Sequence, residues 1–263
     1  MDLGLKDKVA LVVASSRGLG RAVAEELAAE GALLVLCARD AETLAETAAE
    51  IAESSGAHIL AAPTDVTAVN DIKRVVESGI ERFGRIDILV TNAGGPPAGT
   101  FEQLTREQWE EATRLTLFSA IEFARQVLPS MKEQRWGRIL NITSIAVKQP
   151  VENLMLSNSL RAGLTGFART LANEVAAYGI TVNNILPGYT RTERLEELAQ
   201  MMADKQGISA KEFSAMWEKE IPMGRLGEPR EFAAVAAFLV SERASYITGT
   251  SIQVDGGWIK SLL

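Results

Sequence analysis

The sequence predicts an α/β fold: one doubly wound sheet of about seven parallel strands, with helices on both faces. Short apolar runs rich in β-branched residues alternate with longer helical patterns, and this alternation is typical of right-handed βαβ units. The chain has 263 residues, 47% of them hydrophobic, which is enough for one large core. We therefore expect residues 1–263 to form a single domain.

The stretch from Val9 to Glu30 is the unit around which we expect the rest to be arranged. Val9 to Val13 is a fully apolar run, as in a strand buried on both faces. A turn rich in small residues follows, and from Leu19 an amphipathic helix runs to Gly31. A strand, a glycine turn and a helix start bring free N–H groups and the positive helix end together, which suits a phosphate. Taken alone, the stretch fits a plain βα turn even better.

The remaining elements follow in order. We expect strands at 32–37, 58–61, 86–91, 138–143, 180–186 and 251–255, and helices at 41–55, from Thr67 as the cap to about Phe83, and at 109–134, 153–178 and 228–239. Residues 192–220 are charged, Met-rich and helical in pattern, and they are predicted to form an inserted helical lid. The lid would cover the rim where the carboxyl ends of parallel strands meet, which is where ligands bind in such sheets.

Composition excludes several classes of function. The formal net charge is −7, whereas nucleic-acid binding requires clustered basic residues. A single cysteine, Cys37, and a single histidine, His58, argue against an internal disulfide, a metal site or a histidine-based nucleophile triad. No apolar run is long enough to span a membrane, and the N-terminus does not resemble a signal peptide. We expect a cytoplasmic protein without metal, nucleic-acid or membrane partners.

Six motifs in order carry a resemblance to a known family. They are ASSRGLG after the first strand, Asp65-Val66, Asn92-Ala93-Gly94, Ser144, Pro187-Gly188 and Val254-Asp255-Gly256-Gly257. Over essentially its whole length the chain resembles the short-chain dehydrogenase/reductase family, and most of all its bacterial members named 3-oxoacyl-carrier-protein reductases. The resemblance implies one Rossmann-like dinucleotide-binding domain, a small-molecule carbonyl or alcohol as substrate, and a homotetramer or homodimer assembled through the two long central helices.

The resemblance also assigns a cofactor site. The residues expected to bind the dinucleotide are Ser15, Ser16, Arg17, Gly18, Leu19, Gly20, Arg39, Asp65, Val66, Asn92, Ala93, Gly94, Arg161, Pro187, Gly188 and Thr192. The usual Thr-Gly at the start of the turn is replaced by Val13 and Ala14. An acidic residue after the second strand would select NAD, but Ala38 stands there. Arg17 and Arg39 instead favour NADP over NAD, with Asp40 as the nearest contrary charge.

The catalytic positions depart from the family pattern of Ser, Tyr and Lys with a helix Asn. Ser144 is in place, but Ser157 stands for the Tyr, Arg161 for the Lys and Thr116 for the Asn. Serine is a much weaker acid than a phenol, and arginine does not release a proton. The candidate catalytic residues are Ser144, Ser157, Arg161 and Tyr189, with Lys148 as a further replacement. For Tyr189 a wall of the substrate pocket, and for Lys148 a solvated loop position, are more common roles than catalysis.

Three functions remain open. The first is an NADP-dependent oxidoreductase that reduces a carbonyl, 3-oxoacyl-like or other, through a non-standard proton relay. The second is a non-catalytic NADP(H)-binding protein. The third is a non-redox lyase or dehalogenase that uses Ser144 and Arg161 on an anionic substrate. The sequence does not identify the substrate.

Overall fold

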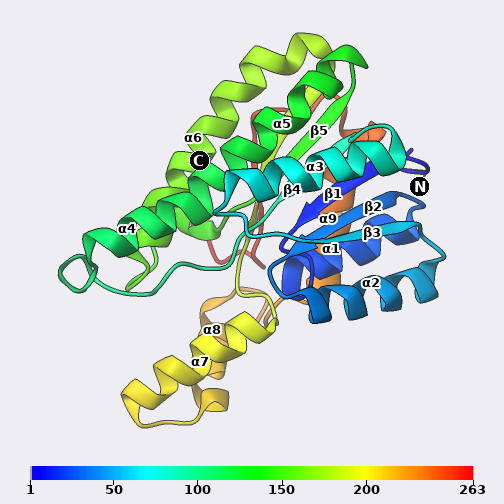
Figure 1. Cartoon of the computed structure of the whole chain (residues 1–263). Coiled ribbons are helices and arrows are strands. Elements are labelled where there is room, and N and C mark those ends of the chain that lie inside the picture. Colours follow the sequence, from blue (N-terminus) through cyan, green and yellow to red (C-terminus); the bar gives the residue numbers. More distant parts are fainter. Residues whose placement is uncertain (1, 263) are drawn as a thin grey trace.

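The computed structural model describes residues 2–262 and contains one seven-stranded parallel sheet of order β3-β2-β1-β4-β5-β6-β7 (Figure 1). The strands are β1 Val9–Val13, β2 Leu33–Ala38, β3 Ile59–Pro63, β4 Ile88–Thr91, β5 Gly137–Ile142, β6 Ile180–Pro187 and β7 Ser251–Val254. Each lies within two residues of its predicted position at either end. The doubly wound sheet of seven parallel strands is thereby confirmed.

Strand β1 lies in the middle of the sheet, and all five of its residues are buried. It pairs with β2 through Val9 and Leu33 and with β4 through Ala10 and Ile88. Because successive side chains point to opposite faces, Ala10 joins one core and Val9 and Leu11 join the other. A strand buried on both faces therefore has no polar position, as its sequence shows.

Helices cover both faces of the sheet (Figure 1). One layer contains α1 Gly18–Ala29, α2 Ala41–Ser55 and α9 Pro229–Leu239; the other contains α3 Val69–Phe83, α5 Ser119–Glu133 and α6 Met155–Val175. Thr67 does not cap α3 as predicted: the N-cap is Ala68. The Thr67 hydroxyl instead donates to Asp65 Oδ1 at 2.8 Å, which places it in the preceding loop.

The segment predicted as one helix over 109–134 is divided. Helix α4 (Arg106–Thr113) starts earlier, at a capping box formed by Thr105 and Gln108. A π-helical turn, Arg114–Phe118, then joins it to α5. Thr116 lies in this turn, and its Oγ1 is buried without a hydrogen-bond partner in the described part of the chain. Such turns are often found at functional sites.

Residues 193–220 form a helical arm made of α7 Glu193–Gln206 and α8 Ala210–Glu220, which projects from the sheet (Figure 1). Phe213 and Trp217 are its buried anchors, and they pack with Trp258 and Ile259 in a third hydrophobic cluster. Phe213 meets Trp217 edge to face at 5.0 Å between ring centroids. The helical pattern predicted for this segment is thus present, and the third cluster joins the arm to residues outside it.

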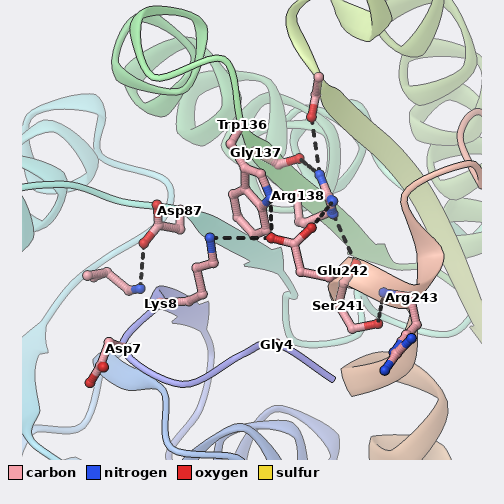
Figure 2. Close-up of polar contacts among 12 residues, drawn as sticks. Gly4, Asp7, Lys8, Asp87, Trp136, Gly137, Arg138, Ser241, Glu242 and Arg243 are labelled. Carbon is pink, nitrogen blue, oxygen red and sulfur yellow. Dashed lines mark hydrogen bonds and ion pairs between the residues drawn. The ribbon is translucent and has the colours of Figure 1, made fainter. Parts of the chain in front are cut away.

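A charged cluster closes the opposite end of the sheet, at the amino ends of the strands (Figure 2). The Lys8 Nζ lies 3.9 Å and the Arg138 Cζ 4.3 Å from the centroid of the Trp136 ring. Glu242 accepts a hydrogen bond from Trp136 Nε1 at 2.9 Å and pairs with Lys8 at 3.5 Å and Arg138 at 3.7 Å. The cluster joins the starts of β1 and β5 to the turn after α9, far from the carboxyl rim.

Candidate functional site

The carboxyl ends of the strands form the rim on which the predicted site residues lie. The strand order reverses between β1 and β4, because β2 lies on one side of β1 and β4 on the other. In open parallel sheets the crevice at such a switch point is where ligands bind. The glycine turn follows β1 and the Asn92 loop follows β4, so the two loops flank this crevice.

The glycine turn holds the end of β1 close to the start of α1. Ala14 has φ +52° and Gly18 has φ +58°, both in the left-handed region that glycine tolerates best. A Cβ atom added to Gly20 would overlap the carbonyl oxygen of Ala14 and lie 3.1 Å from Asn92 Nδ2. Only glycine therefore allows α1 to start this close to β1. Ala14 thus has a backbone angle that glycine adopts more readily than alanine.

Ser15 and Ser16 are buried in this turn and help to hold it. The Ser15 N–H donates to the Cys37 carbonyl at 3.2 Å, and the Ser16 carbonyl accepts from Thr47 Oγ1 at 2.9 Å. These bonds tie the turn to β2 and α2. Leu19 is half-buried at the start of α1 and packs against the core on that face.

Two basic residues flank the end of β2. Arg17, the N-cap of α1, and Arg39 are both exposed. The Asp40 carboxylate accepts a hydrogen bond from the Thr43 N–H at 2.7 Å as the N-cap of α2. The pKa of Asp40 is lowered by this hydrogen bond first and in smaller part by the charge of Arg17. The Asp40 carboxylate is thus bound to the N-terminus of α2. The side chains of Arg17 and Arg39 beside it are exposed to solvent.

The Asp65-Val66 pair follows β3. Asp65 is exposed, and its Oδ1 accepts hydrogen bonds from the N–H of Thr67 at 2.9 Å and from its hydroxyl. Val66 is 7% exposed and packs in the core with Cys37. One carboxylate oxygen of Asp65 is thus held in the loop, with the apolar Val66 side chain beside it.

The β4 loop lies next to the glycine turn. Asn92 Nδ2 donates to the Ala14 carbonyl at 3.5 Å, and Asn92 Oδ1 accepts from the Ala93 N–H at 3.0 Å. A Cβ added to Gly94 would meet nothing within 4 Å, so Gly94 borders open space. The two loops on either side of the switch point are therefore in contact.

The residues after β6 complete the rim. Gly188 donates to the Val254 carbonyl at 2.9 Å, and a Cβ on it would lie 2.7 Å from Asp255 Cα, so Pro187-Gly188 run tightly beside the end of β7. Thr192 is the N-cap of α7, where its Oγ1 accepts from the Leu195 N–H at 3.3 Å.

Arg161 is the central feature of the predicted catalytic group. It is 8% exposed, and its Nη1 donates to the carbonyls of Ile142 at 3.0 Å and Thr143 at 2.8 Å, at the end of β5. Its Nε donates to Ser157 Oγ at 3.2 Å, one helical turn earlier on α6. Within residues 2–262 no carboxylate pairs with it. Burial lowers its pKa to about 10, which leaves it charged at neutral pH.

Ser144 follows directly after the Thr143 carbonyl that Arg161 binds. It is the N-cap of a short 3₁₀ turn, and its Oγ accepts from the Ala146 N–H at 3.1 Å. A hydroxyl that accepts one hydrogen bond keeps its own proton for donation. Ser157 and Arg161 thus share one helix face, as their four-residue spacing predicted, and Arg161 binds the carbonyl of the residue before Ser144 at the end of β5.

Tyr189 and Lys148 have other contacts. The Tyr189 ring stacks on Trp217 at 4.9 Å between centroids and meets Trp258 edge to face at 5.7 Å. Burial, with a smaller effect of Glu220, raises the pKa of Tyr189 to about 12, which makes its phenol a weaker acid than a free one. Lys148 Nζ donates to Gln253 Oε1 at 3.1 Å.

Among residues 2–262 no cluster of His, Cys, Asp and Glu has the arrangement of a metal site. None of the helices described in that range has the length and apolar character needed to cross a membrane.

The residues present fit a dinucleotide. The glycine turn leaves no room for a side chain at Gly20, Gly94 borders open space, and Arg17 and Arg39 are exposed beside the turn. A doubly wound sheet with such a turn at its switch point defines a dinucleotide-binding protein of the Rossmann type.

Comparison with known proteins identifies the family. A family model described as enoyl-(acyl carrier protein) reductase matches residues 13–259. The 3-oxoacyl-(acyl-carrier-protein) reductase FabG of Aquifex aeolicus is 34% identical over 257 residues, which cover 98% of this chain and 99% of the relative. The crystal structure of L-sorbose reductase from Gluconobacter frateurii, complexed with NADPH and L-sorbose, has a TM-score of 0.95, 36% identity and full coverage of both chains. The chain belongs to the short-chain dehydrogenase/reductase family.

The structure also brings two residues to the rim that the sequence did not single out, Glu193 and Arg194. They follow the cap Thr192 at the start of α7. An acidic and a basic residue at a helix start are common on solvated surfaces, so spacing alone gave no signal that α7 begins against the two rim loops.

Proposed function

We propose that the protein is an NADP-dependent reductase that converts a carbonyl to an alcohol, with Ser144 and Arg161 as the polar groups at the carbonyl oxygen. NADP(H) is the cofactor: the exposed Arg17 and Arg39 suit a 2′-phosphate, and the NADPH-bound L-sorbose reductase shares the whole fold. The observation that carries the proposal is the buried Arg161 guanidinium, held at the end of β5 next to Ser144.

Bound NADPH supplies the hydride. The Ser144 hydroxyl, with its oxygen already accepting from Ala146, donates to the carbonyl oxygen of the substrate and orients it. Arg161 stabilises the negative charge that develops on this oxygen, because a charged group in a water-poor site acts strongly on a nearby oxyanion. It holds its own proton throughout. The proton that completes the alcohol passes from the serine hydroxyl, which regains one from water.

Ser157 and Tyr189 have supporting roles in this proposal. Ser157 accepts from Arg161 Nε and so keeps the guanidinium in place on the helix face. Tyr189, held between Trp217 and Trp258, forms a wall of the substrate region rather than the proton donor, since its pKa is raised to about 12. The relay is therefore different from the family pattern in both acid and cation.

The test is the oxidation of NADPH by the purified protein in the presence of a carbonyl panel that includes 3-oxoacyl thioesters and ketoses. We expect steady oxidation with at least one compound and a loss of about 100-fold or more in kcat for Ser144→Ala. Ser159→Ala is the control for loss of a serine hydroxyl: Ser159 lies on the same helix as Ser157, but its side chain is exposed. No oxidation above the blank, or an unchanged Ser144→Ala variant, contradicts the proposal.

A second candidate is a non-catalytic NADP(H)-binding protein. It is favoured by one observation: Arg161 already donates to two backbone carbonyls and to Ser157, so it has a structural role without any substrate. This candidate predicts that NADPH raises the melting temperature in proportion to its concentration while no carbonyl is turned over. Steady turnover rules it out.

We further propose a homotetramer or homodimer that packs through α5 and α6. Phe118, at the start of this region, is 57% exposed, and the small residues Ala162 and Gly163 are exposed on α6. Light scattering of the eluting protein measures the mass directly. A monomeric mass at micromolar concentration contradicts this assembly.

A further inference from the structure

The start of α7 lies against both loops of the dinucleotide crevice. Measured from a Cβ placed on Gly18 in the glycine turn, Thr192 Cγ2 lies at 3.8 Å and Glu193 Oε2 at 3.9 Å. Measured in the same way from Gly95 in the β4 loop, Arg194 Nε and Nη2 both lie at 3.4 Å. Three consecutive residues, the N-cap Thr192 and the first two residues of α7, thus lie next to the two loops that flank the switch point.

The charge of Arg194 is only weakly engaged in this position. Its ion pair is with Glu197, one turn along the same helix, at 3.5 Å between Nη1 and Oε2. The two side chains are 57% and 63% exposed, and exposed pairs of this kind contribute little. Arg191 differs, because it pairs with Glu228 at 3.3 Å and Glu218 at 4.0 Å. The Arg194 guanidinium can therefore leave Glu197 at little cost in energy and pair with an anion of higher charge.

Apart from Arg194, the groups expected to bind the diphosphate of a dinucleotide in the crevice are neutral hydrogen-bond donors. Arg17 and Arg39 lie toward the end of β2, where Arg17 acts on the Asp40 carboxylate, and this is the side of the 2′-phosphate. Arg161 is buried at the end of β5. Between them, the glycine turn offers backbone N–H groups and the positive end of α1 to the diphosphate. The Arg194 guanidinium lies beside Gly95, and it is carried by the same helix start that lies beside the glycine turn at Gly18.

We propose that Arg194 is a cofactor-binding residue, whose guanidinium leaves Glu197 and binds the diphosphate of NADP(H) from the helical arm. The proposal rests on the NADP assignment. A guanidinium presents paired N–H groups that match two phosphate oxygens, and charge-assisted bonds of this kind are stronger than neutral ones. Because Arg194 is carried by α7, binding of the cofactor holds the arm against the rim.

Separate titrations with NADPH and NADH, followed by quenching of tryptophan fluorescence, test the contact. Both cofactors contain the diphosphate, so Arg194→Gln is expected to raise both dissociation constants by the same factor, about tenfold to a hundredfold. Arg39→Gln, at the 2′-phosphate, is expected to weaken NADPH more than NADH. Arg106→Gln is the neutral control: Arg106 is exposed on α4 and pairs with Glu110 at 2.9 Å.

The negative charge of the neighbouring residue Glu193 provides an independent test of where the diphosphate binds. Glu193 lies at Gly18 and repels the same diphosphate, so Glu193→Gln is expected to tighten both cofactors. Hydrogen exchange of residues 193–220 is expected to slow when NADPH binds to the wild type, and to slow less in Arg194→Gln at saturating cofactor.

The proposal is overturned if Arg194→Gln leaves both dissociation constants unchanged, or if it weakens NADPH alone, which would place the contact at the 2′-phosphate. Melting temperatures of the variants confirm that each is folded. Failure of the wild type to bind either cofactor would instead refute the NADP assignment, so the two failures are distinguishable.

Discussion

Gly20→Ala tests whether the glycine turn is built around the contact between β1 and α1. The added methyl group would overlap the Ala14 carbonyl oxygen and lie 2.9 Å from its carbonyl carbon and 3.1 Å from Asn92 Nδ2. Two of these atoms belong to the backbone of the turn, so the start of α1 must shift. Overpacking of this kind costs about 1–3 kcal/mol in the free energy of unfolding.

For a chain of this size that cost corresponds to a fall of roughly 2–12 °C in melting temperature. The shift also moves the N–H groups that face the diphosphate, so we expect the dissociation constant for NADPH to rise by about tenfold or more. Calorimetry gives the first quantity and fluorescence titration the second.

Gly166→Ala is the matched control. Gly166 is exposed on α6, and a Cβ there meets nothing within 4 Å. NADPH binding is expected to be unchanged, because Gly166 lies on α6 and not in the glycine turn. Alanine is the better helix former, so a single subunit is expected to gain about 0.5–1 kcal/mol of stability; since the proposed assembly packs through α6, this gain is measured at a concentration where light scattering gives a monomer. The reasoning is refuted if Gly20→Ala melts and binds NADPH like the wild type.

Two further predictions concern the charged cluster and the catalytic group. Glu242→Gln removes the carboxylate that pairs with Lys8 and with the 3% exposed Arg138, and since Glu242 is itself 46% exposed we expect a loss of about 1 kcal/mol in urea unfolding. Glu110→Gln, in an exposed pair on α4, is its control and should change stability by less than about 0.5 kcal/mol. For the reaction, the pKa of Tyr189 is raised to about 12 and that of Arg161, lowered to about 10, still lies well above neutrality. Both groups therefore stay protonated from about pH 6 to 9, and kcat/KM is expected to be constant over this range. A change in kcat/KM that follows a pKa near 7 would contradict this expectation, because it would show a titrating acid that this site does not provide.

The sheet was predictable because its strands carry a strong local signal. Val9–Val13 is apolar throughout, since both faces are buried, and the glycine turn after it identifies the first βα unit. The i,i+4 step from Ser157 to Arg161 also predicted one shared helix face, and the 3.2 Å hydrogen bond between them confirms it. Local periodicity is enough for features of this kind.

Features that depend on tertiary packing were not predictable. The π-helical turn at 114–118 has an ordinary helical sequence, and only packing decides that one residue is inserted there. The start of α4 did carry a signal, the Thr105–Gln108 capping box, which the predicted boundary missed. In the sequence, the negative charge of Asp40 counted against the NADP preference that Arg17 and Arg39 indicate. Its role as the cap of α2 depends on its backbone geometry, which the sequence did not show. The contact of Arg194 with Gly95 depends on where the arm folds back.

The central proposal is that hydride reaches a carbonyl carbon at a site that has Ser144 and Arg161 but neither the usual Tyr nor the usual Lys. The most direct measurement uses NADPH deuterated at the transferable C4 position and mass spectrometry of the product. The proposal predicts one deuterium on the new carbinol carbon, formed at a rate that Ser144→Ala lowers without loss of NADPH binding. NADPH that binds but transfers no deuterium to any carbonyl of the panel would contradict it.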